Sequence, residues 1–153
     1  MPPKKSHTTL EGLVQVLGRK KSREILAAYA ADTEPMGDTL TIIANVGVHH
    51  LPAELLRGHV FKASVGNLDF SSISSVRAEY RRILKKLAGV LKNKKWKTVY
   101  LVPFGHSTLS MQIKLLVYRV TRIETVDIFY DGQGHYYDLS LDQRAIIVNS
   151  GGK

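Results

Sequence analysis

Residues 98–122 read TVYLV, PFGHST and LSMQIKLLVYRVTR, and two different periodicities meet here across one small turn. The first segment is an apolar run of β-branched and aromatic residues closed by Pro103, which predicts a buried strand. In the last segment apolar residues recur at offsets of four, seven, eight and eleven, the spacing of one helix face: Leu109, Ile113, Leu116, Val117 and Val120. The stretch therefore predicts a strand, a turn at Gly105 and a helix.

The turn itself, residues 104–108, is a candidate site for an anion. The first N–H groups of a helix lack intrahelical partners and lie at the positive end of its dipole. Open α/β sheets bind ligands at this position, just beyond the carboxyl ends of their strands. We expect Ser107 or Thr108 to cap the helix and to offer a hydroxyl to a ligand. The alternative is a turn that only caps the helix, because these residue types also occur where nothing binds.

The composition indicates an anionic partner. Among 153 residues, 22 Lys and Arg stand against 13 Asp and Glu, which gives a net charge of +9. Such a charge favours contact with nucleic acid, nucleotides or an anionic surface. The chain has no cysteine, which excludes disulfides and thiolate catalysis, and it lacks the glycine motifs of dinucleotide-binding folds and NTPases. No signal peptide or apolar membrane span is evident, so we expect a cytoplasmic protein without a membrane partner.

The first 37 residues are expected to form a separate unit, an arm followed by two helices. Thr8 and Glu11 have the spacing of a capping box ahead of apolar residues at helical spacing, and a second helix is expected from Ser22. A basic corner at 19–21 joins them, as in a helix-turn-helix reader of nucleic acid. The alternative is a pair of packing helices or a dimerisation arm.

A second candidate loop follows the first expected strand, residues 39–46. It contains Gly47, His49 and His50, and in a parallel sheet it opens on the same edge as Gly105. Adjacent side chains of an extended segment point to opposite sides, so the two histidines are not expected to hold one metal ion. We therefore expect no metal and no cofactor.

The other expected elements are a strand at 60–65, a long helix after the serine-rich segment 71–75, a hairpin of strands at 125–130 and 135–139, and an edge strand at 144–149. Strands that alternate with helices favour a mostly parallel sheet. The sequence therefore predicts an α/β fold over residues 38–149, a Rossmann-like sheet flanked by helices with a late antiparallel hairpin. Residues 150–153 are expected to be a flexible tail.

The long helix is expected to have an apolar face and a basic face. The basic residues are Arg77, Arg81, Arg82, Lys85, Lys86 and Lys92. A solvated surface accounts for most of them, and their summed charge also steers anions.

The segment VDIFYDGQGHYYDL, residues 126–139, follows this helix, the apolar strand and the small-residue turn 104–108. This order, over about residues 70–142, resembles the SAVED and CARF-like sensor domains of bacterial antiphage systems of the CBASS or type III CRISPR kind. His106 stands where that family often has proline. A full SAVED domain looks like two CARF-like halves, so the resemblance implies a single half that needs a second copy to complete its pocket.

The resemblance implies a stand-alone sensor subunit that binds a cyclic oligonucleotide or related nucleotide second messenger, with an effector protein in trans. The expected ligand-binding residues are Gly47, His49, His50, Phe104, Gly105, His106, Ser107, Thr108, Tyr130 and Tyr136. Backbone N–H groups and hydroxyls would hold phosphates, and Tyr130 or Tyr136 would stack on a base. The sequence has no evident catalytic constellation, so an enzyme is not the first expectation.

Two other functions stay open. One is a small metal-independent ring nuclease for cyclic oligoadenylate, in which His106 acts as acid or base on a positioned ribose hydroxyl. The other is a basic DNA- or RNA-binding protein, whose affinity would fall steeply with salt.

The helix after the turn carries more apolar residues than one packed face requires, since Met111, Leu115 and Tyr118 lie off the main stripe. We expect the second apolar face to pack on the N-terminal helices or on the same helix of a twofold-related copy. The sequence therefore predicts a homodimer or larger assembly that brings two 105–108 turns together.

Overall fold

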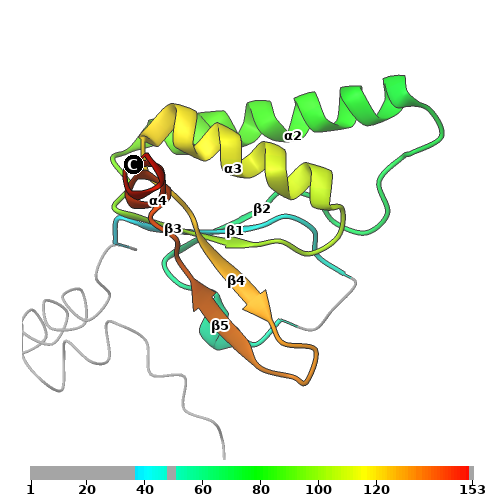
Figure 1. The fold of residues 1–153 in the computed structure, drawn as a ribbon. Coiled ribbons are helices and arrows are strands. Elements are labelled where there is room, and N and C mark those ends of the chain that lie inside the picture. The colour runs from blue at the N-terminus through cyan, green and yellow to red at the C-terminus, as the bar shows by residue number, and fades with distance from the viewer. Residues whose placement is uncertain (1–36, 48–50, 152–153) are drawn as a thin grey trace, which may run out of the picture. The chain divides into compact units, whose positions relative to one another are not determined.

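The computed structural model describes residues 37–47 and 51–151 (Figure 1). The expected N-terminal arm and helical pair lie outside the described residues, as do His49, His50 and the last two residues of the chain. The elements are β1 Thr39–Ile43, the 3-10 turn η1 Ala53–Leu55, β2 His59–Lys62, α2 Ile73–Asn93, β3 Thr98–Val102, α3 Ser107–Thr121, β4 Val126–Tyr130, β5 Tyr136–Leu139 and α4 Gln143–Ser150.

The five strands form one sheet in the order β2-β1-β3-β4-β5. The first four are parallel, and β5 pairs antiparallel with β4 as a hairpin. The expected α/β class is therefore confirmed: the sheet is mostly parallel, with helices beside it and an antiparallel hairpin at its late edge. Among the described helices, none is long and apolar enough to cross a membrane.

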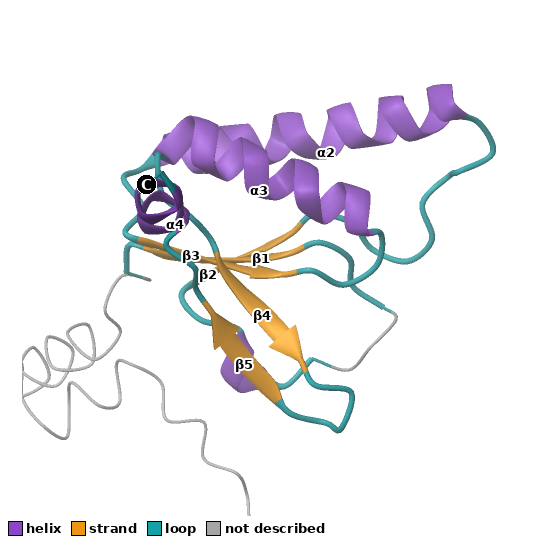
Figure 2. Cartoon of the chain, viewed as in Figure 1, coloured by secondary structure: helices purple, strands orange, loops and turns teal. Residues whose placement is uncertain are grey.

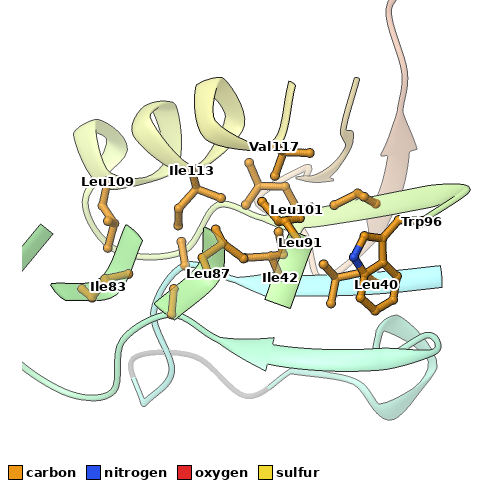
Figure 3. Close-up of a cluster of buried hydrophobic side chains, with 13 residues drawn as sticks. Leu40, Ile42, Ile83, Leu87, Leu91, Trp96, Leu101, Leu109, Ile113 and Val117 are labelled. Atoms are coloured by element: carbon orange, nitrogen blue, oxygen red, sulfur yellow. The ribbon is translucent and has the colours of Figure 1, made fainter. Parts of the chain in front are cut away.

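Helices α2 and α3 lie side by side across one face of the sheet (Figure 2). Their buried residues recur at helical spacing and meet the apolar residues of β1 and β3 in one core (Figure 3). Leu87, Ile113 and Val117 are fully buried there. Both faces of β1 and β3 are buried, which explains why these strands read as continuous apolar runs.

The opposite face of the sheet is covered by the short β1–β2 connection that contains η1. Leu55 of this segment packs with Ile43, Val102 and Ile128 in a second, smaller core. Arg57, at the end of the same segment, lies 4.5 Å from the centre of the Tyr100 ring. The segment covers this face of the sheet, as a crossover helix does in larger α/β sheets.

Arg57 also fixes this segment to two strands of the sheet, β1 and β5. Its backbone N–H donates to the Thr41 hydroxyl, and that hydroxyl donates to the Arg57 carbonyl at 2.7 Å. Its guanidinium pairs with Asp138 of β5 at 2.6 Å. The Asp138 carboxylate makes the largest contribution to raising the pKa of Arg57, and the Tyr100 hydroxyl makes the next largest. The Arg57 guanidinium therefore stays charged.

The edge strand expected at 144–149 is wrong, because these residues belong to α4. The Asp142 carboxylate accepts a hydrogen bond from the Ala145 N–H at 3.0 Å, which is an N-cap. A local cap thus outweighs the strand propensity of the β-branched residues that follow. The strand expected at 60–65 begins one residue earlier and ends at Lys62, and Val65 makes only an isolated bridge with Val46.

Candidate functional site

The strand order places a topological switch point between β1 and β3. From β1 the chain moves to β2 on one side of the sheet, and after α2 it returns to β3 on the other side. The loops that follow β1 and β3 therefore diverge at the carboxyl edge, where ligands bind in open α/β sheets. Gly105 and Asn45 are in contact here, since a Cβ added to Gly105 would lie 2.8 Å from the Asn45 Cβ.

A pocket of about 550 Å³ lies beside this point, at the carboxyl ends of β3 and β4. Its lining residues are Pro103, Phe104, Gly105, Ile128, Phe129, Tyr130 and Tyr136. Three aromatic rings are grouped here: the Tyr130 and Tyr136 centroids are 4.9 Å apart, and those of Phe104 and Tyr136 are 6.2 Å apart. Four of the residues expected to bind a ligand thus line one pocket.

The hairpin turn holds the two tyrosines in place. Tyr130 and Tyr136 face each other in the β4–β5 register, and Asp131 closes the loop between them. Its carboxylate accepts hydrogen bonds from the N–H groups of Gln133 at 2.7 Å and His135 at 3.1 Å. The Gln133 N–H, and after it His135, hold the pKa of Asp131 below its usual value, so this carboxylate remains ionised.

Gly105 has φ of +84°, so the turn before α3 uses the left-handed conformation that the sequence predicts for it. The cap differs from the prediction: His106 is the N-cap residue, and neither Ser107 nor Thr108 caps the helix. The His106 carbonyl accepts hydrogen bonds from Leu109 and Ser110. No described residue accepts a hydrogen bond from the N–H of Ser107 or Thr108, and unpaired N–H groups at the start of a helix are the kind that bind anions.

Sequence reasoning missed two buried polar side chains, one after β1 and one in the first turn of α3. Asn45 is 4% exposed, and its Nδ2 donates to the Gly66 carbonyl at 3.1 Å while its Oδ1 has no partner among the described residues. Ser110, in the first turn of α3, is 7% exposed, and its hydroxyl is also unpartnered. Buried polar groups are normally paired. The available signals were an amide directly after an apolar strand and a serine beside Leu109 on an apolar helix face.

His106 and Thr108 lie on the α2 side of the turn and do not line the aromatic pocket. The His106 ring packs against Phe70, with centroids 4.0 Å apart. The Thr108 hydroxyl is 2.7 Å from the Tyr80 hydroxyl of α2. The Thr108 contact joins the start of α3 to α2, and the His106 contact joins it to the segment before α2.

Gly47 is separate from the pocket lining. It has φ of +114°, and a Cβ there would lie 3.6 Å from the Gly66 nitrogen. Gly66 in turn donates to the Val46 carbonyl and accepts from Asn45. Gly47 therefore contacts Gly66, the residue that holds the Asn45 side chain. His49 and His50, which were also expected to bind the ligand, lie outside the described residues.

The pocket lining in the described part of the chain is mainly aromatic and apolar. The titratable groups in the lining are tyrosine hydroxyls, and the described residues contain no group of three potential metal ligands. The chain matches no protein-family model, no curated protein and no solved structure with which it was compared. The resemblance to SAVED and CARF-like domains therefore stays a prediction.

Proposed function

We propose that the protein binds a cyclic oligonucleotide or related nucleotide second messenger, as a stand-alone sensor subunit in antiphage defence. The observation that supports this most is that the aromatic pocket is lined by Gly105, two residues before Ser107, whose N–H at the start of α3 has no acceptor among the described residues. One base would lie against Tyr130 and Tyr136, and one phosphate would accept hydrogen bonds from Ser107 and Thr108.

The pocket has the right size and surface for one nucleotide unit. Its volume of about 550 Å³ lies inside the range of small-molecule sites, roughly 300–1,000 Å³. Stacking of a base on an aromatic side chain contributes about 1–3 kcal/mol. The helix dipole and the net charge of +9 favour an anion at the same edge. A ligand with several nucleotide units would extend beyond this pocket, either to the β1 loop or to a second copy of the chain.

Binding is favoured over cleavage by the position of His106. The ring nuclease reading needs His106 at the ribose hydroxyl, but its ring packs on Phe70 and is not part of the pocket lining. Chromatography of a cyclic oligoadenylate after incubation with the protein decides between the two. Recovery of intact ligand supports a sensor, and a linear product supports the nuclease.

The proposal is tested by isothermal titration of the full chain with a panel of cyclic dinucleotides and oligonucleotides. A matched pair of variants then tests the phosphate position. Ser107→Pro removes one N–H at the first helical position, where proline is well tolerated, and the preceding residue already has φ −79° and ψ 120°. Ser107→Ala removes only the hydroxyl.

We expect Ser107→Pro to weaken ligand binding by about tenfold, the loss of one charge-assisted hydrogen bond, and Ser107→Ala to bind nearly as the wild type does. Tyr130→Ala should weaken binding by a similar factor through lost stacking. Absence of heat with every member of the panel would overturn the proposal. Equal affinity of the proline and alanine variants would exclude the start of α3 as the phosphate site.

A further inference from the structure

Helix α2 presents a long basic stripe on its exposed side, away from its core residues. Ile83, Leu87 and Leu91 are buried against the sheet and α3. At 100° per residue, Arg77, Arg81, Lys85 and Lys92 fall within one stripe about 80° wide, whose centre lies about 125° around the helix from the centre of the buried residues. All four side chains are exposed. With a rise of 1.5 Å per residue, the stripe runs for roughly 22 Å along the helix.

Small residues border the basic stripe. Ala78 and Gly89 are exposed and lie beside the four cations on the helical wheel. A Cβ on Gly89 would meet no atom within 4 Å, which confirms that its surroundings are open. Such a surface permits close approach of a polymer backbone.

The four cations have no ion-pair or hydrogen-bond partner in the described part of the chain. Among the described residues, the ion pair within α2 joins Arg82 to Glu79, outside the stripe. Like charges four residues apart, as at Arg77, Arg81 and Lys85, destabilise an isolated helix. Because no carboxylate of the described residues neutralises these cations, an anionic partner would supply the missing negative charges and relieve their repulsion.

We propose that this face binds the phosphate backbone of duplex nucleic acid, independently of the nucleotide pocket. A duplex fits better than a single strand because the stripe has no exposed aromatic side chain on which bases would stack. It also fits better than a membrane, since the stripe lacks the large apolar residues of an interfacial helix. The cations contact phosphates and read no bases, so binding is independent of sequence.

The test is fluorescence anisotropy of the full chain with a random 20-base-pair DNA duplex, from 50 to 200 mM salt. The variant Arg77→Gln/Arg81→Gln/Lys85→Gln keeps good helix formers and lowers the net charge by three. The matched control Lys62→Gln/Arg119→Gln/Arg144→Gln removes three exposed cations from β2, α3 and α4. Each neutralised phosphate contributes about 0.9 to the slope of log K against log salt.

We expect the α2 variant to reduce this slope by about 2.7, and the control to change it by less than one. Arg77→Lys/Arg81→Lys keeps the charges and should keep the wild-type slope. Circular dichroism shows whether the glutamine variant folds. If it does not fold, the salt dependence of the lysine variant still tests whether the charge of these positions is sufficient for binding. An RNA duplex that binds with the same slope supports a backbone surface.

Equal losses in the α2 variant and the control would overturn the proposal, because net charge alone would then explain binding. It would also be overturned by wild-type protein that binds anionic phosphatidylserine vesicles or polyglutamate but not a duplex at 50 mM salt. Binding of small nucleotides to the aromatic pocket is measured separately and does not affect either outcome.

Discussion

Asn45 and Gly105 meet where the loops after β1 and β3 diverge, and their contact leaves no room for a side chain on Gly105. A Cβ would lie 2.8 Å from the Asn45 Cβ and 3.0 Å from its Nδ2. Gly105 also has φ of +84°. The turn that positions the start of α3 therefore requires glycine for two separate reasons, backbone conformation and close approach.

Gly105→Ala is expected to destabilise the protein by about 3 kcal/mol, and Gly132→Ala by about 1 kcal/mol. Gly132 is the matched control because it has φ of +80° but nothing within 4 Å of an added Cβ. The difference between the two variants isolates the contact with Asn45. Urea denaturation followed by circular dichroism measures both, and equal losses would show that the turn can move away from Asn45.

Ser110→Ala is expected to stabilise the protein. The buried hydroxyl of Ser110 has no partner among the described residues, and alanine has the higher helix propensity. We expect a gain of about 0.5–1 kcal/mol in the free energy of unfolding. Thermal denaturation of the variant and the wild type measures this. A loss of stability would indicate that the hydroxyl already has a structural partner.

The sequence predicts the architecture well because the signals for it are local. The apolar periods of β1, β3, α2 and α3 and the glycine turn at Gly105 follow from neighbouring residues. The hairpin that brings Tyr130 and Tyr136 together is also a local signal, although the strand expected from residue 135 begins at Tyr136, which makes the turn one residue longer than predicted. Four residues of the aromatic pocket can therefore be identified from the sequence alone.

Other features depend on contacts that are distant in sequence. Lys114 is a charged residue on a largely apolar helix, and only the structure shows that it pairs with Asp127 of β4 at 2.5 Å and joins α3 to the sheet. The role of Asn45 is visible only in the structure, where its side chain is buried in contact with Gly105. Residues 143–150 differ, because their β-branched side chains favour a strand while the Asp142 cap, a local signal, starts a helix.

Asp131 predicts a specific dependence of stability on pH. Its pKa in the folded protein is lowered from the usual 3.8, first by the N–H of Gln133. A carboxylate with a lowered pKa stabilises the fold at pH values above its unfolded pKa, and this contribution is lost as the pH falls through the folded value. Asp131→Asn should therefore be less stable than the wild type at pH 7, and the difference should shrink below about pH 3.8.

Denaturation of both proteins at pH 7 and near pH 2 measures this effect. Near-ultraviolet circular dichroism gives a second readout, because Tyr130 and Tyr136 flank the loop that Asp131 closes. A difference between the two proteins that stays constant over this pH range would show that hydrogen-bond geometry, and not the charge, carries the contribution.

The outer face of α3 carries the prediction about assembly. Met111 is 63% exposed and Leu115 is 50% exposed, and with Ile147 of α4 they border an apolar groove of about 430 Å³. Within the described residues α4 covers only part of this face. We predict a homodimer through α3, which would place two Gly105 turns near each other for a ligand with internal symmetry.

Leu115→Glu is expected to convert the assembly to monomers, because a carboxylate would be buried in an apolar interface. Gln112→Glu is the matched control, since it adds the same charge at an exposed polar position of the same helix. Light scattering at several protein concentrations, with and without a cyclic dinucleotide, measures the mass. A wild-type monomer under all these conditions would contradict the prediction, and so would equal dissociation of the Gln112 variant, because added charge rather than the apolar face would then control the assembly.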